Sequence, residues 1–343
     1  MKTCGIIVEY NPFHKGHIYH IQKTKEITEC DCLVAITSGH FSQRGLPSLI
    51  SKYDKTRLAL EHGVNLVLEL PVCYTAQSAD RFAKYSINSL NSLDIDTICF
   101  GSESNDIEKL KAYADMLSDI DVDPSKSQLQ NTFEILGDLS PNDILGVSYI
   151  NACKEYGIKP VSIQRDGSFK SATATRNDYL SGQKEAFDAY FHKEQSWQSY
   201  YPYLRNILLL TSSKDLERFH LVNEGIQNRL KDSARKSDTW DDFLQSAISK
   251  TYTAARIQRT CLMICLQITN EQMNAHRDYT AVKVLGFDSI GRKILHAHKD
   301  ADIISRFEDL DPFLQDIEMK TNTFYNGVMK DKIKEEKVIV YDR

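Results

Sequence analysis

Residues Thr3–His17 read TCGIIVEYNPFHKGH, and they join a strand pattern to the start of a helix. The apolar, β-rich run Thr3–Glu9 predicts a first strand, and the residues after it predict a helix over 15–28. His14 and His17 are three residues apart, so at a helix start they share one face. The free N–H groups and partial positive charge of a helix N-terminus attract anions. The sequence therefore predicts a phosphate site at the end of the first strand.

The alternation of strand and helix continues through the first half of the chain. Further strand-like runs lie at Cys32–Thr37, Asn65–Leu70, Thr97–Phe100 and Pro160–Ile163, and helical patterns lie at 52–62, 77–92, 105–118 and 141–156. Such alternation, with near-continuous apolar strands, implies a parallel sheet covered on both faces. Ligands of such sheets bind beyond the carboxyl ends of the strands. We predict an α/β fold with a Rossmann-like, doubly wound parallel sheet.

The pattern changes after about residue 185. Residues 186–275 hold few strand-like runs and many helical ones, such as Ala255–Ile268. A mixed tail follows, with a last strand-like run at Val338–Tyr341. Because a chain of 343 residues suggests two domains, we predict an α/β domain over residues 1–185 and a mainly helical domain over residues 186–343.

Composition excludes several classes of protein. Apolar residues make up 41% and charged residues 26%, and the net charge is −5. A disordered chain would be less apolar and more charged, and a protein that mainly coats nucleic acid would be basic. No secretory signal is visible and no run approaches the ~20 apolar residues that span a bilayer. We therefore expect a cytoplasmic protein with no membrane partner.

The eight cysteines do not follow a metal-binding pattern. Cys30 and Cys32 form C-x-C, and Cys261 and Cys265 have helical spacing, so neither pair has the C-x-x-C layout of a structural zinc site. We expect buried thiols and no protein-held metal.

The chemistry of the His-x-Gly-His segment points to nucleotides. Two imidazoles at a helix start can donate hydrogen bonds to phosphate oxygens, where charge develops when an α-phosphate is attacked. Gly16 would let a ligand approach the backbone, and Asn11–Pro12 would fix the turn. The alternative is a capping turn with two surface histidines. The position after a first strand favours nucleotidyl transfer, with His14 and His17 as the catalytic residues.

A second segment fits the same site. Gln164 and Arg165 follow the strand at 160–163, and the run Lys170–Arg176 reads KSATATR. Hydroxyl groups and an arginine at a helix start can hold the β- and γ-phosphates of ATP and the leaving pyrophosphate. The alternative is an ordinary capped helix with solvated basic residues.

Both motifs resemble those of the H-I-G-H type of nucleotidyltransferases. A longer set of blocks resembles the tRNA(Met) cytidine acetate ligase family. These blocks are GIIVEYNPFHKGHIYH (5–20), SGHFSQRGLP (38–47), LVLELPVCYTAQSADRFA (66–83), FGSES (100–104), PNDILGVSYI (141–150) and SATATR (171–176). Weaker similarity continues at YTAARIQR (252–259) and VKVLGF (282–287).

The resemblance implies a specific reaction. Members of that family activate acetate with ATP to acetyl-adenylate, release pyrophosphate and transfer the acetyl group to N4 of the wobble cytidine of elongator tRNA(Met). Mg²⁺ is expected to accompany ATP. Residues 1–185 would then be the nucleotidyltransferase-like, ATP-binding catalytic domain, and residues 186–343 the tRNA-binding domain.

The ATP site is expected from the resemblance together with the two motifs. Its residues are Ile7, Val8, Glu9, Tyr10, Asn11, Pro12, Phe13, His14, Lys15, Gly16, His17, His20, Gly101, Asn142, Asp143, Gln164, Arg165, Ser171, Thr173 and Arg176. The chain departs from the family pattern at His40, Leu46 and Gln164, where the family suggests Asn, an acid, and Lys or Arg.

A basic segment in the second half is the candidate tRNA surface. Between Arg229 and Arg259 the net charge is +3, and Tyr252 could stack on a base. The candidate residues are Arg229, Lys231, Arg235, Lys236, Tyr252, Arg256 and Arg259. The alternative for this segment is a solvated helix face with mixed charges.

Other functions remain open on the sequence. An adenylyltransferase acting on a phosphorylated cofactor precursor, such as phosphopantetheine, shares the first motif but needs only the first domain. A non-catalytic RNA-binding protein would not need both histidines and the SATATR segment. An acetyl-CoA-dependent acetyltransferase would need a pyrophosphate-binding loop that the sequence does not show. We expect an ATP-dependent acetate ligase acting on tRNA.

Overall fold

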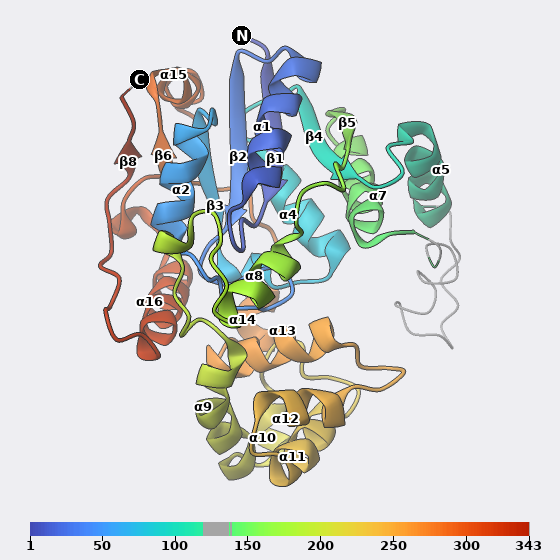
Figure 1. Ribbon diagram of the computed structural model, residues 1–343, viewed down its shortest axis with the longest axis vertical. Coiled ribbons are helices and arrows are strands. Elements are labelled where there is room, and N and C mark those ends of the chain that lie inside the picture. The colour runs from blue at the N-terminus through green and yellow to red at the C-terminus, as the bar shows by residue number, and fades with distance from the viewer. Residues whose placement is uncertain (119–136, 138, 343) are drawn as a thin grey trace.

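The first strand, β1 (Thr3–Val8), lies inside a sheet with the order β5-β4-β1-β2-β3-β6-β7, in which β8 pairs with β6. The structure is a computed structural model that describes residues 1–118, 137 and 139–342. Five strands run parallel: β1, β2 (Cys32–Ser38), β3 (Leu66–Leu70), β4 (Thr97–Ser102) and β5 (Lys159–Gln164). In Figure 1 they run from the chain's start at the top toward the lower part of the molecule.

Helices cover both faces of this sheet. The helices of this part are α1 (Lys15–Thr28), α2 (Lys52–Glu61), α3 (Val72–Thr75), α4 (Ala79–Asn91), α5 (Ile107–Ser118), α7 (Pro141–Lys154) and α8 (Ala172–Leu180). Alternate residues of β2 enter different cores, because successive side chains of a strand point to opposite faces. Leu33 packs in the core that contains Ile21 of α1 and Leu58 of α2. Val34 packs in the core that contains Phe82 of α4.

A helical region follows, which Figure 1 shows below the sheet. It contains the short helix η1 (Asp188–Tyr190), α9 (Trp197–Leu210), α10 (Ser213–Leu216), α11 (Ile226–Lys236), α12 (Trp240–Ala247), α13 (Ala254–Cys265) and α14 (Asn270–Ala275). Trp197 and Trp240 stack at its centre with ring centroids 4.6 Å apart. The mainly parallel sheet and this helical region confirm the predicted fold class.

The last part of the chain returns to the sheet. It contains β6 (Val282–Phe287), α15 (Ser289–Ala297), β7 (Ile303–Ile304), η2 (Phe307–Asp309), α16 (Pro312–Gly327) and β8 (Ile339–Val340). β6 pairs antiparallel with β3, so the sheet includes strands from both sides of residue 185. The boundary at residue 185 stays a prediction, and the helical region ends before β6. The strand-like run at Val338–Tyr341 contains β8.

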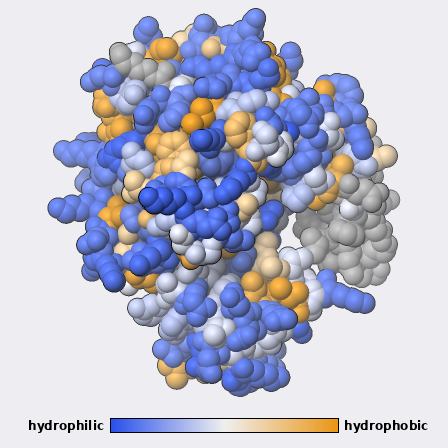
Figure 2. All heavy atoms as spheres, in the orientation of Figure 1, coloured by the Kyte–Doolittle hydropathy of each residue, from blue (hydrophilic) through white to orange (hydrophobic). Residues whose placement is uncertain are grey.

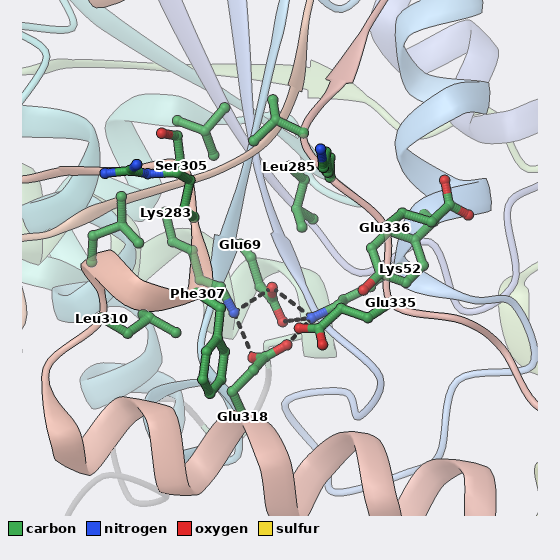
Figure 3. A pocket seen from close by; sticks show the side chains of 16 residues that line it. Lys52, Glu69, Lys283, Leu285, Ser305, Phe307, Leu310, Glu318, Glu335 and Glu336 are labelled. Atoms are coloured by element: carbon green, nitrogen blue, oxygen red, sulfur yellow. Dashed lines mark hydrogen bonds and ion pairs between the residues drawn. The ribbon is translucent and has the colours of Figure 1, made fainter.

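Four buried charged side chains connect this returning part to the sheet (Figure 3). Lys52 of α2 and Lys283 of β6 both contact Glu69 of β3, with Nζ–Oε2 distances of 3.2 and 2.8 Å. Both lysines also contact Glu318 of α16. Burial would raise the pKa of Glu318, but the charges of Lys283 and Lys52 hold it well below its usual range. We call this group the lysine–glutamate quartet.

The described residues show three further features. No helix among them is long and apolar enough to cross a membrane. All eight cysteines are free thiols. Figure 2 shows a largely hydrophilic face over the sheet-containing part and the helical region alike.

Candidate active site

Hydrogen bonds connect the turn between β1 and α1 to the loop at residues 38–49. Glu9 Oε1 accepts a hydrogen bond from Gln43 N at 2.5 Å. Asn11 donates through Nδ2 to Pro47 O at 3.2 Å and accepts from Leu49 N at 3.0 Å. These bonds use the side chains of Glu9 and Asn11. The two residues therefore fix the turn that sets the direction of α1.

His14 and His17 form a reciprocal cap at the start of α1. His14 is the N-cap residue, and its Nδ1 accepts from Gly16 N at 3.1 Å. His17 Nδ1 accepts from His14 N at 3.2 Å, which completes a capping box. Since each Nδ1 is an acceptor, each neutral ring carries its proton on Nε2. The two rings therefore each offer one N–H donor that the cap does not use.

The surroundings keep these rings uncharged near neutral pH. Burial, with a smaller effect of the Arg165 guanidinium, lowers the pKa of His14 to about 4. Burial and the neighbouring His14 lower the pKa of His17 well below its usual range. His20 lies one turn further along α1, and burial is again the main cause that lowers its pKa to about 4. The site can thus donate hydrogen bonds to phosphate oxygens without a charged imidazole.

Gly16 has a packing role that its sequence position did not indicate. A Cβ atom there would lie 2.8 Å from Cε1 and 3.0 Å from Nδ1 of His14. The glycine is needed because the His14 ring folds back over it to cap the helix. This packing requirement is a separate reason for the glycine, and the interpretation that Gly16 admits a ligand stays a prediction.

Several predicted ATP residues meet around Glu103, which the sequence reasoning missed. Asn142 donates through Nδ2 to Oε1 of Glu103, and Arg165 Nη1 lies 3.3 Å from that oxygen. Gln164 Nε2 donates to Glu103 O at 2.8 Å. A Cβ on Gly101 would lie 3.2 Å from Arg165 Cγ. The ends of β4 and β5 and the start of α7 therefore bring Gly101, Asn142, Gln164 and Arg165 together.

Asp143 bonds to the same segment at the end of β4 as Asn142, but at Ser102 and Ser104 instead of Glu103. It is buried and accepts hydrogen bonds from the Ser102 hydroxyl and from Ser104 N. Burial would raise its pKa, but the serine hydrogen bonds lower it overall. This carboxylate fixes the loop after β4 to α7, which favours a structural role over contact with ATP.

The predicted phosphate-binding segment at α8 divides into two parts. Arg176 Nη2 donates to Asn11 O at 2.5 Å, so α8 reaches the turn after β1. Ser171 is the N-cap of α8 and accepts from Ala174 N at 3.1 Å, while Thr173 is exposed. Lys170 pairs with Asp178 and Glu185, each at 2.7 Å.

The remaining residues of the predicted segment lie along β1 and α1. Ile7 and Val8 pair with β2. Tyr10 and Phe13 are buried with ring centroids 4.9 Å apart, Pro12 follows a cis peptide bond, and Lys15 is exposed.

Lys55 of α2 is a second residue that sequence reasoning missed. Its side chain is fully buried, and Nζ donates to Glu9 O, Ser38 O and Gly39 O at 2.9, 3.1 and 3.0 Å. Burial lowers its pKa to about 7. The lysine therefore connects, through these hydrogen bonds, the residues that follow β1 to the carboxyl end of β2.

The predicted tRNA residues do not all face solvent. Lys231 is buried and donates to Leu208 O at 2.7 Å, and Arg229 donates to Ala247 O and Ile248 O. Those two residues connect helices of the helical region. Arg235 pairs with Asp232 at 2.6 Å and Lys236 is exposed. Arg256 pairs with Glu224 at 3.0 Å and lies over the Tyr252 ring.

The described residues contain no group of three or more His, Cys, Asp or Glu side chains that could hold a metal ion. Mg²⁺ that accompanies a nucleotide needs no such group, because it usually keeps several waters and is bound through one or two carboxylates plus phosphate oxygens.

Comparison with known proteins agrees with this geometry. Residues 1–338 match the family model for HIGH Nucleotidyl Transferase. A protein of Oceanobacillus iheyensis named "tRNA(Met) cytidine acetate ligase" is 32% identical, with 97% of this chain and 96% of the relative covered. A protein of the same name from Bacillus subtilis is 30% identical, with 98% and 94% covered. The crystal structure of Thermotoga maritima TmcAL bound with alpha-thio ATP is 27% identical, covers all of both chains and has a TM-score of 0.88. The chain therefore belongs to the HIGH nucleotidyl transferase family and, within it, to the tRNA(Met) cytidine acetate ligases.

Proposed function

We propose that this protein joins acetate to N4 of the wobble cytidine of elongator tRNA(Met), using ATP. Its relatives of near-equal length bear the name of this activity, and a structural neighbour was crystallised with an ATP analogue. The observation that carries the proposal is the paired His14 and His17 cap, whose free Nε2–H donors lie at the carboxyl end of β1.

In the first step a carboxylate oxygen of acetate attacks the α-phosphorus of ATP. The bond from that phosphorus to the bridging oxygen breaks, and pyrophosphate leaves with the electron pair. Acetate is already ionised at pH 7, so the step needs no general base. His14 and His17 would stabilise the charge that develops on the α-phosphate oxygens.

In the second step the exocyclic amine of cytidine attacks the acetyl carbon of acetyl-adenylate. The C–O bond to AMP breaks, and the nitrogen loses a proton as the amide forms. The base must leave the stack to reach the site, which is easier in a single-stranded anticodon loop.

ATP would enter with Mg²⁺, and Arg165 would accompany its phosphates. The positive charge of Arg165 adds to the lowering of the pKa of His14, His17 and His20, which supports this role. We place the reaction in the cytoplasm, where its tRNA substrate is used.

Two assays test this function. Acetate-dependent exchange of labelled pyrophosphate into ATP, without RNA, reports the first step. Incubation with ATP, labelled acetate and total tRNA, followed by digestion of the RNA, should yield N4-acetylcytidine. The product should not form when acetyl-CoA replaces acetate. Exchange that requires phosphopantetheine instead of acetate would favour the adenylyltransferase alternative, and RNA binding without exchange would favour a non-catalytic protein.

A further inference from the structure

Three arginines lie where the active-site turn meets the helical region. They are Arg44 in the loop at 38–49, Arg176 of α8 and Arg259 of α13. Figure 1 shows α8 at the lower end of the sheet and α13 at the top of the helical region below it. The carboxyl ends of the parallel strands point toward this junction.

The loop that carries Arg44 is packed directly on α13. Gly45 has a φ of +75°, and a Cβ there would lie 2.8 Å from Arg259 N and 2.9 Å from Gln258 O. Trp197 of α9 donates through Nε1 to Gly45 O at 2.9 Å. Arg44 is exposed and directly precedes Gly45 on this loop.

The same loop is connected to Arg176 through Asn11. The Asn11 side chain bonds to Pro47 O and Leu49 N, and its carbonyl oxygen accepts from Arg176 Nη2. Arg176 Nε is buried and has no hydrogen-bond partner within the part of the chain that the structure describes. One donor of this guanidinium is therefore left for a ligand.

The charges of these arginines are not balanced by direct ion pairs. Among the described residues, no carboxylate lies within ion-pair distance of Arg44, Arg176 or Arg259. Burial lowers the pKa of Arg176 to about 10. The charge of Arg44 lowers this pKa further, and the charge of Glu9 raises it. Burial also lowers the pKa of Arg259 to about 10. The charges of Arg256 and Arg44 lower this pKa further, and the charge of Asp80 raises it. A bound anion would stabilise these three cations, because no ion pair with a carboxylate compensates their charge.

We infer that Arg44, Arg176 and Arg259 bind a phosphate of the RNA backbone next to the reacting cytidine. Guanidinium groups suit phosphate because their planar donors match its oxygens. Arg259 belongs to the helical region, and the histidines respond to Arg165 rather than to Arg44 or Arg259. Arg44 and Arg259 therefore lie beside the nucleotide site. Arg176 donates to Asn11 O at the border of that site, and the inference assigns it to the RNA instead of to the ATP phosphates expected from the sequence. This inference rests on the proposed function, because it names the position at which that substrate is held.

The test compares Arg44→Gln and Arg259→Gln with Arg306→Gln. Arg306 is 72% exposed and pairs with Asp309 far from the junction, so it serves as a matched surface control. Binding of tRNA is measured as a function of salt. Each phosphate contact that is lost should weaken binding by about tenfold and reduce the slope of log K against log salt by about one. Arg306→Gln should keep the wild-type slope.

The pyrophosphate exchange assay, run without RNA, identifies the source of the phosphate. We expect the KM for ATP to stay within about twofold of wild type in Arg44→Gln and Arg259→Gln while the tRNA affinity falls. An increased KM for ATP with an unchanged salt slope would assign the arginines to ATP and overturn the inference. If Arg259→Gln does not fold, the exposed Arg44→Gln decides alone. Absence of acetate-dependent exchange in the wild type would instead refute the proposed function and leave the salt measurement as the test of this site.

Discussion

His14 and His17 face each other with ring centroids 3.8 Å apart, and each uses Nδ1 to accept a backbone N–H at the start of α1. One nitrogen of each ring therefore builds the helix start, and the other is available to a ligand. The two roles can be separated by substitution, because Asn and Gln each reproduce one part of the imidazole.

His14→Asn should keep the cap and lose the Nε2 donor. Asn is a favoured N-cap residue, so thermal stability should stay close to wild type. Loss of one donor to a developing oxyanion typically lowers kcat by about 10²–10³, and we expect that decrease in acetate-dependent pyrophosphate exchange. His14→Gln, which places an amide donor nearer the Nε2 position, should recover part of the rate. Wild-type exchange in His14→Asn would show that the ring does not contact the reacting phosphate.

Gly16→Ala should damage catalysis more than folding. The added Cβ would press on the His14 ring, which must then move away from its capping position. A displacement of about 1 Å can cost about a hundredfold in rate, whereas Ala favours a helix over Gly. Exchange kinetics and thermal unfolding measure the two effects. Gly327→Ala, at the end of α16 with nothing within 4 Å of its Cβ position, is the control: it should leave exchange unchanged and should not lower thermal stability.

Acidification should destabilise the protein through its buried histidines. His20 and His220 both have a pKa of about 4, with burial as the first cause, against about 6.5 in an unfolded chain. Below pH 6.5 the unfolded chain binds protons that the folded protein does not, so the free energy of unfolding falls from pH 6.5 to 4. Urea denaturation at several pH values should show this decrease. His20→Gln should show a smaller one, and a decrease equal to that of wild type would contradict the assignment.

Lys283→Met should be strongly destabilising because it leaves Glu69 and Glu318 with one lysine between them. Breaking a buried ion pair from one side costs about 3–5 kcal/mol. The double variant Lys283→Met with Glu318→Gln, which restores charge balance, should be more stable than the single variant in urea. A double variant that is less stable by the sum of both single effects would argue against a coupled quartet.

The sequence predicted the local features of this molecule better than the distant contacts. The strand–helix alternation and the helix starts at Lys15 and Pro141 depend on residues only a few positions apart. The partners of Lys170 and Lys231 depend on how helices pack: the exposed Lys170 pairs with Asp178, and the buried Lys231 donates to a backbone carbonyl.

The same reason explains which residues sequence reasoning missed. Glu103 gathers side chains from α7 and β5, and Lys55 joins two strand ends that are separated along the chain. Neither residue stands in a motif, since a glutamate after a strand and a lysine in an amphipathic helix are common. Their roles arise from the sheet order, which periodicity does not give.

The pairing of β3 with β6 also determines when the sheet can be completed as the chain is synthesised. β3 is synthesised more than two hundred residues before Val282, the first residue of its antiparallel neighbour. Until then, an apolar strand edge and the charged pair Lys52 and Glu69 have no cover from β6 or α16. An uncovered strand edge invites pairing with other chains. The sheet is thus begun first but completed last, and the growing chain is most vulnerable to aggregation while the helical region is being made.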